Sequence, residues 1–226
     1  MYFRECLSIY NRNLLIILLL TLLIICPLQV LMYGWLFYLI DIHAVDYINT
    51  KFLYLNILMF VIAVPPFIQI TLADLNDEEA SFRESITLYI NHFGLLFLTC
   101  CIGFIVGFGG SFLFFIPTLV VFVFLLLFPL FMKEKETIQS IISRIFTLCK
   151  SRWLDILIFT IWICLINLLV WVVSLNLLNY FEINNLTVIF LRIVINLILY
   201  PYLYILLVRN FHPSFEGQEE FNWNHY

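Results

Sequence analysis

Charge is scarce in this chain. Only 12% of its 226 residues are Asp, Glu, Lys or Arg, against about 25% in typical soluble domains, and none of them lies between Phe93 and Met132. This uncharged stretch is about twice as long as the roughly 20 apolar residues that cross a bilayer as one helix. Gly107, Gly109 and Gly110 lie near its middle, where a helical hairpin can turn. The sequence therefore predicts a polytopic membrane protein.

Motifs that carry chemistry are also missing. The six cysteines form no C-x-x-C pair, the four histidines are dispersed, and neither H-E-x-x-H nor G-x-S-x-G occurs. No basic cluster is combined with an aromatic platform, which argues against nucleic-acid binding. The acidic residues between 74 and 79 are interpreted as a helix N-terminal charge cluster, since acids favour that position. We predict no catalytic residues, no cofactor, no metal site and no enzymatic activity.

The apolar runs predict an all-α transmembrane bundle. Bilayer hydrocarbon offers no partners for unpaired backbone groups, so each span must be helical, and continuous rather than alternating apolar runs argue against a β-barrel. The first run is longer than the apolar region of a signal peptide and is expected to remain as a span. We predict one domain over residues 1–211 and a polar tail over 212–226. The predicted spans are about 14–40, 52–73, 93–108, 112–132, 154–177 and 186–208.

Lys and Arg are distributed unevenly around these six spans, and the excess marks the cytoplasmic side. One side, which carries both termini, has nine basic residues, whereas the other has only Lys51; Arg192 falls within the sixth span. Both termini are therefore predicted to be cytoplasmic. The nine residues are Arg4, Arg12, Arg83, Lys133, Lys135, Arg144, Lys150, Arg152 and Arg209.

A short repeat suggests three structural units. Residues 3–10 (FRECLSIY) and 82–89 (FRESITLY) are identical at four of eight positions, and each is followed by an apolar run. Residues 138–150 have helical apolar spacing of the same character. We predict three units in parallel order, each an interfacial amphipathic helix followed by a hairpin of two spans. Chance similarity among apolar segments remains the alternative.

Several segments resemble one known family. The opening FRECLSIYNRNLLIILLLTLL (3–23), the fourth span with Pro117-Thr118 and Pro129, the amphipathic segment 140–153 and the closing segment 196–209 are similar to the YciC family of uncharacterised enterobacterial inner-membrane proteins. Thr118 stands where that family has glycine. The wider group includes membrane domains of glycerophosphodiester phosphodiesterases, but this chain has no such catalytic domain. The resemblance implies a bacterial inner-membrane location and no transferable activity.

Arg192 is the most unusual residue, because charge at membrane depth is costly. It is interpreted either as an anion contact or gating group, with Glu182 as a possible pairing partner, or as an arginine that reaches outer headgroups. Amides in or beside the spans are candidates for a solute pathway or for bonds between helices. Pro65-Pro66 and Pro117 predict helix kinks, and Pro65-Pro66 also permits a broken helix with a site at mid-membrane. The amides are Asn56, Gln69, Asn167, Asn176 and Asn196.

Two functions follow from this pattern. The leading hypothesis is a non-enzymatic protein that organises lipids or binds other membrane proteins, because amphipathic helices recognise the headgroup boundary. The alternative is a small-solute transporter or channel, based on the prolines, the amides and Arg192. The predicted partners are membrane lipids and other membrane proteins. The sequence predicts neither a substrate nor an oligomeric state.

Overall fold

The structure is a computed structural model that describes residues 3–41, 56–111, 115–132, 137–181 and 185–213. The described residues form helices joined by short turns, without strands, as the apolar runs predict. Besides the helices there are a π-helical turn, η1 (Thr21–Ile25), and a 3₁₀ turn, η3 (Phe128–Phe131). The helices are α1 (Phe3–Arg12), α2 (Leu14–Leu20), α3 (Cys26–Asp41), the segment Asn56–Ile62, α5 (Pro65–Leu75), α6 (Phe82–Ser111), α7 (Phe115–Leu127), α8 (Ile138–Ser151), α9 (Trp153–Phe181) and α10 (Asn185–Phe211).

Four described helices are long and apolar enough to cross a membrane: Leu14–Trp35, Phe82–Val106, Trp153–Val170 and Ile189–Phe211. The pair Asn56–Ile62 and Pro65–Leu75 makes a fifth if the two helices count as one span. Val120–Phe131 is apolar but shorter. The described residues therefore give four or five candidate spans, and the predicted number of six is not confirmed. The predicted 112–132 span begins in residues outside the described ranges.

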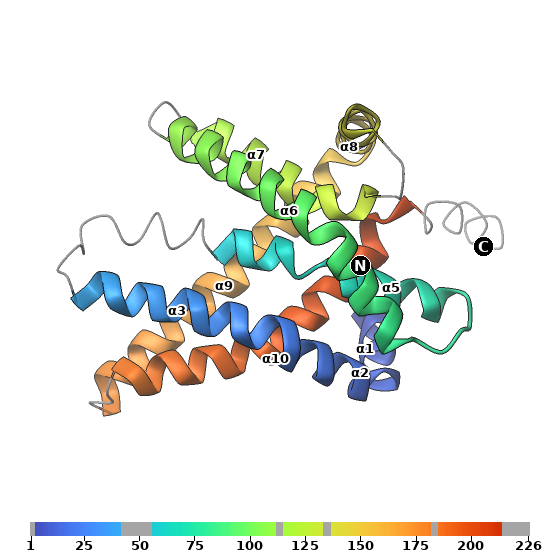
Figure 1. Ribbon diagram of the computed structural model, residues 1–226. Coiled ribbons are helices and arrows are strands. Elements are labelled where there is room, and N and C mark those ends of the chain that lie inside the picture. The colour runs from blue at the N-terminus through green and yellow to red at the C-terminus, as the bar shows by residue number, and fades with distance from the viewer. Residues whose placement is uncertain (1–2, 42–55, 112–114, 133–136, 182–184, 214–226) are drawn as a thin grey trace.

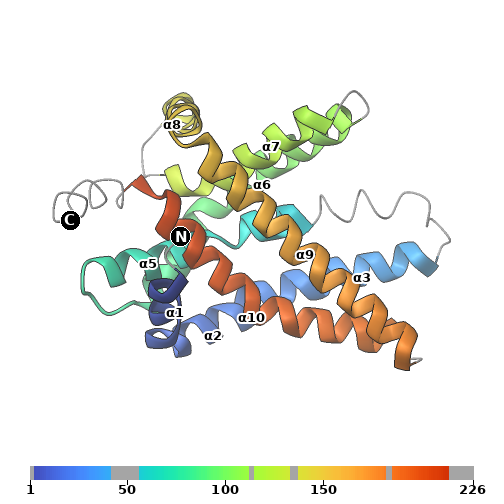
Figure 2. The same cartoon turned by 180° about the vertical axis from the view of Figure 1, so that it is seen from behind.

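The ends of the long helices gather at two ends of the molecule. In Figures 1 and 2, α1, the beginning of α6 and the end of α10 lie at one end of the molecule, and the distal ends of α3, α6 and α9 lie at the other. α6 and α7 run side by side as an antiparallel pair. They approach closely at Gly103, because a Cβ atom built there would lie 2.7 Å from Leu125 Cδ1. The absence of a side chain at Gly103 thus permits this close approach.

The first span contains a local change of helix type. α2 passes through η1 into α3, and the N–H of Cys26 donates to the carbonyl of Thr21, five residues earlier. Pro27 follows directly and has no N–H to offer the carbonyl of Leu23. A single π turn within an α-helix is a common way to accommodate such a disturbance, and it keeps the 14–41 segment helical.

The predicted amphipathic helices do not all take the same form. α1 is separated from α2 at Asn13, and α8 is separated from α9 at Arg152; both residues leave helical backbone geometry. The second predicted helix is not separate, because α6 runs unbroken from Phe82 into its span. No glycine or proline lies between Phe82 and Phe93 to end the helix, so the chain avoids leaving two unpaired helix ends at the membrane surface.

Polar bonds dock α1 against the ends of α5 and α10. The Arg209 guanidinium donates to Glu5 Oε1 at 2.9 Å, and the Arg12 guanidinium lies 2.8 Å from both carboxylate oxygens of Asp74. The Tyr202 hydroxyl donates to the carbonyl of Phe3 at 3.3 Å. These bonds place the N-terminal helix and the end of the last span at one end of the molecule.

The Pro65-Pro66 pair lies at a break rather than a smooth kink. The helices on either side are bent by 43°, and residues 63 and 64 are not helical. Aromatic rings from both sides of the break pack on α10: the Tyr204 ring centroid lies 4.5 Å from that of Phe60 and 4.9 Å from that of Phe67. The broken helix is thereby fixed against the last span.

Candidate functional site

One face of α10 carries three polar residues at helical spacing. Arg192, Asn196 and Tyr200 follow one another at intervals of four, which places them on one side of the helix. Their exposed fractions are 5%, 1% and 1%, whereas Phe190 and Ile198, on the other side, are 67% and 64% exposed. The polar side of α10 thus faces the bundle, as the cost of placing polar groups against lipid requires.

α3 supplies the facing residues. Gln29 and Tyr33 are also four residues apart and are both buried. The Asn196 Nδ2 donates to Gln29 Oε1 at 3.0 Å, across 167 residues of sequence. The Arg192 guanidinium carbon lies 5.6 Å from the Tyr33 ring centroid, within the range of a cation–π interaction. α3 and α10 are therefore joined by an amide pair and by a cation on an aromatic ring.

Two further helical segments contribute side chains that contact Tyr200. The Tyr200 hydroxyl lies 3.3 Å from Asn56 Oδ1, on the segment before the break, and 3.4 Å from Asn167 Oδ1, on α9. Both distances exceed the usual range for a hydroxyl donor, so these are weak hydrogen bonds, and the hydroxyl has one proton to donate to the two acceptors. We call the seven side chains the Arg192 cluster: Gln29, Tyr33, Asn56, Asn167, Arg192, Asn196 and Tyr200.

The Arg192 cluster lies deep within the bundle. At 1.5 Å per residue, Asn196 is about 17 Å along α10 from Asn185 and about 22 Å from Phe211. A bilayer core is roughly 30 Å thick, so these distances place Asn196 near its middle when α10 spans it. Of the seven side chains, only Arg192 carries a formal charge, which gives the cluster a positive character and many hydrogen-bond donors.

The structure distributes the predicted site residues unevenly. Arg192 and Asn196 lie in the cluster, whereas Pro65 and Pro66 are buried at the helix break. Pro117 lies in the first turn of α7, a helix that contributes nothing to the cluster. Glu182 lies outside the described residues, so its predicted pairing with Arg192 stays a prediction.

The five predicted amides do not lie in one place. Asn56 and Asn167 belong to the cluster with Asn196. Gln69 instead donates to Glu84 Oε2 at 2.9 Å, at the end of the molecule that holds α1, and Asn176 is exposed on α9. Three of the five amides therefore converge through the tertiary fold.

Sequence reasoning missed Gln29, Tyr33 and Tyr200. A signal was present, because Gln29 and Tyr33 are four residues apart and Tyr200 continues the spacing of Arg192 and Asn196. Tyrosine is common in membrane helices and often lies at the interface, so its presence alone does not indicate a buried hydroxyl. Helical spacing of polar residues within a span is the more informative pattern.

The Asn196–Gln29 bond is expected to contribute modestly to stability. A double-mutant cycle with Asn196→Ala and Gln29→Ala should give a coupling energy of about 0.6 kcal/mol and no more than about 1.7 kcal/mol, the range for hydrogen bonds between membrane helices. Chemical unfolding in mixed micelles measures it. A control cycle pairs Asn196→Ala with Gln69→Ala, which bonds elsewhere, and should give no coupling. Zero coupling in the first cycle would contradict the geometry.

Comparison with known proteins adds no family. No family model matches the chain, and neither the curated proteins nor the solved structures contain a significantly similar one. Among the described residues, no group of three or more His, Cys, Asp or Glu side chains is arranged to hold a metal ion. The Arg192 cluster is therefore interpreted from its own chemistry.

Proposed function

We propose that the chain is a non-enzymatic membrane protein that binds and carries a small anionic solute at the Arg192 cluster. The observation that carries this proposal is the burial of Arg192, about 10 Å along α10 from Asn185, beside hydrogen-bonding groups from four helical segments. A guanidinium offers several donors in a fixed plane, which suits a carboxylate or phosphate. The amides and phenols around it supply further contacts to a polar ligand.

Helix packing alone is a weaker explanation of this arginine. Placing a cation at the centre of a span costs about 2.5–3.5 kcal/mol on insertion scales and less nearer the interface, so Arg192, in the first third of α10, bears part of this cost. The neutral pair Asn196–Gln29 already links α3 to α10 at 3.0 Å without that cost. A charge in addition to this bond favours a role in binding, for which positive charge is useful. This argument supports the transport alternative over the organising hypothesis.

The broken helix supports a carrier rather than a static site. Asn56 belongs to the short helix before the break, and Tyr200 connects it to α10. Discontinuous helices near the bilayer midplane are typical of transporter binding sites. Moving Asn56 relative to Arg192, which would open the cluster to one side of the membrane, would require the Phe60 and Phe67 rings to shift on Tyr204.

Purified protein in nanodiscs tests the proposal against a panel of small carboxylates and phosphates. A bound solute at 100 times its Kd should stabilise the protein by about 2.7 kcal/mol, and the same solute should show saturable uptake into proteoliposomes. Arg192→Gln should abolish both effects. Arg83→Gln, which removes an exposed arginine from α6, is the matched control and should retain both. A panel with no stabilising solute, or binding that survives Arg192→Gln, would contradict the proposal.

We propose six crossings in three hairpins, with both termini in the cytoplasm of a bacterial inner membrane. The bonds between α1 and the end of α10 support an even number of crossings. The basic residues at this end include Arg12, Arg152 and Arg209, which supports the cytoplasmic orientation. The resemblance to the YciC family agrees with this location and remains a prediction.

Membrane organisation is the second candidate function, and a different element supports it. α8 has exposed apolar side chains although it is too polar to span, with Phe146 the most exposed at 75%. A surface of this kind fits lipid or another membrane protein. The two functions are compatible, because they use separate parts of the molecule.

A further inference from the structure

The apolar side of α8 is only half covered by protein. Ile141, Ile145 and Leu148 are buried, and α8 packs against η3 and α9. At 100° per residue, the apolar residues of α8 cover an arc of about 160°, and the buried three occupy less than half of it. The rest is an exposed stripe in which Ile138, Ile142 and Phe146 have exposed fractions of 52%, 39% and 75%.

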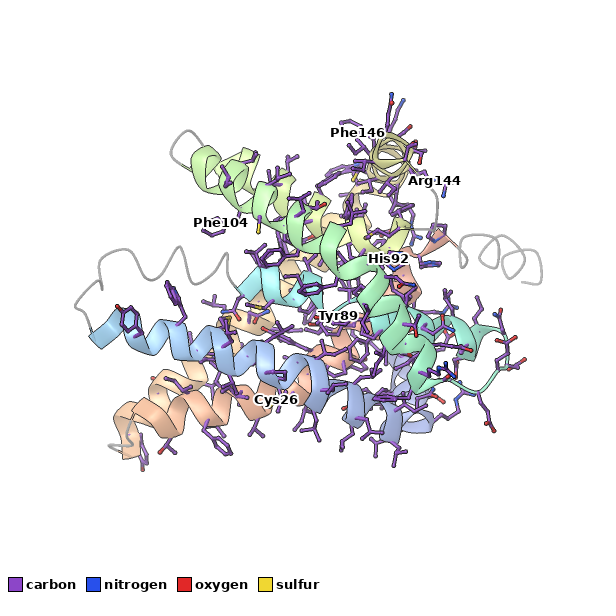
Figure 3. The ribbon with its side chains drawn as sticks, viewed as in Figure 1. Cys26, Tyr89, His92, Phe104, Arg144 and Phe146 are labelled. Atoms are coloured by element: carbon purple, nitrogen blue, oxygen red, sulfur yellow. The ribbon has the colours of Figure 1, made fainter. Side chains whose placement is uncertain are left out.

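The direction of α8 is that of a helix on a membrane surface. Figure 1 shows α8 end-on, whereas α3, α6, α7 and α10 run across the view. α8 thus lies across the spans, at the end of the molecule that also holds α1. In Figure 3, Phe146 lies on the side of α8 that faces α7, and Arg144 lies on the opposite side. The exposed stripe therefore faces the region that lipid occupies beside the spans.

The positive charge of α8 favours anionic lipids. The helix contains Arg144 and Lys150 and no Asp or Glu. Lys150 is one turn beyond Phe146, about 40° around the helix axis, and is exposed. A lysine at this edge can keep its carbon chain on the apolar stripe while its ammonium group reaches a headgroup phosphate. Basic residues beside membrane spans attract anionic lipids in this way.

We propose that α8 lies in the headgroup layer of one leaflet, with Ile138, Ile142 and Phe146 at the acyl boundary and Lys150 on the phosphate of an anionic phospholipid. This assignment does not depend on solute binding at Arg192. It deepens the second candidate function by naming anionic phospholipid as the partner. A protein that covered the same stripe is an alternative that the experiment separates.

Depth measurement tests the apolar part of the proposal. Spin labels are placed at position 146 or 147 of the full-length chain, with the native cysteines replaced, in nanodiscs of phosphatidylcholine and phosphatidylglycerol. Position 147 is the control, because Thr147 is exposed about 100° away on the polar side. The label at 146 should be accessible to oxygen and protected from a water-soluble nickel chelate, with the reverse at 147. Equal exposure of both labels to nickel, or a label at 146 shielded from both reagents, would overturn the proposal.

A second measurement tests the charge. The Tm of the wild-type protein should be several degrees higher in nanodiscs that contain phosphatidylglycerol than in phosphatidylcholine alone. Lys150→Gln should lose most of this gain, whereas Arg83→Gln should retain it. The rise in Tm of the wild-type protein with phosphatidylglycerol should also disappear at high salt, since salt screens exposed charges. An unchanged gain in Lys150→Gln would overturn the assignment of Lys150. Neither measurement involves a solute, so failure here leaves the Arg192 proposal standing.

Discussion

Tyr204→Ala should lower the free energy of unfolding by about 3 kcal/mol, near the lower end for large aromatic-to-alanine changes in packed cores. The ring is fully buried between Phe60 and Phe67, on the two sides of the helix break, and also meets Tyr200. Its loss leaves a cavity where the broken helix joins α10. The lower value is expected because a chain that unfolds in lipid gains less from hydrophobic transfer and depends more on packing.

Tyr204→Phe separates the ring from its hydroxyl. Among the described residues, the Tyr204 hydroxyl meets no hydrogen-bond partner. Removing a buried unsatisfied hydroxyl should therefore be neutral or stabilise the protein by up to about 1 kcal/mol. Unfolding titrations in mixed micelles measure both variants. A loss above 1 kcal/mol in Tyr204→Phe, or a small loss in Tyr204→Ala, would show that Tyr204 is not packed as described.

Cys6 should react with a maleimide about a thousandfold more slowly than a cysteine introduced at Ser8, measured at pH 8. Burial of Cys6 under α10 raises the pKa of its thiol from 9.0 to about 12, and the neighbouring Glu5 carboxylate acts in the same direction. A three-unit shift lowers the reactive thiolate fraction by about a thousandfold. Ser8 is exposed on the same helix, so its cysteine variant is the matched control.

The pH dependence of the Cys6 reaction tests whether the pKa of its thiol is raised in the folded protein. Its rate should still rise about tenfold per pH unit above pH 9, where an ordinary thiol levels off. Because the folded pKa is raised, the folded state also loses stability as the pH rises from 9 towards 12. Similar rates for Cys6 and the position-8 cysteine would mean that α1 is not docked on α10.

The sequence was sufficient to predict an all-helical membrane protein and the approximate positions of its long helices. The uncharged residues 93–132 and the run from 14 to 40 decide this, since few other folds accommodate such segments. It was not sufficient to predict the form of the surface helices. Three similar amphipathic segments became two separate helices and the first turns of α6, because only Asn13 and Arg152 interrupt the helical backbone.

The candidate site could be predicted only in part. Arg192 stood out because a charge within an apolar run is energetically unusual. The pairing of Asn196 with Gln29 joins residues 167 positions apart, and helical periodicity identifies the faces of single helices but not their neighbours. The break at residues 63–64 could likewise be predicted only in part. Two successive prolines indicate that the helix is interrupted, but the bend depends on packing against Tyr204, which the sequence does not reveal.

Sidedness of labelling in sealed, oriented vesicles tests the central claim that α10 crosses the bilayer and holds Arg192 at depth. Single cysteines are introduced at Ser8, Glu79 and Thr187, all exposed, in a chain without native cysteines. An impermeant maleimide should label positions 8 and 79 from one side only, and position 187, at the beginning of α10, from the other side only. Labelling of position 187 from the same side as position 8 would contradict a membrane-spanning α10 and remove the basis for a site at mid-membrane.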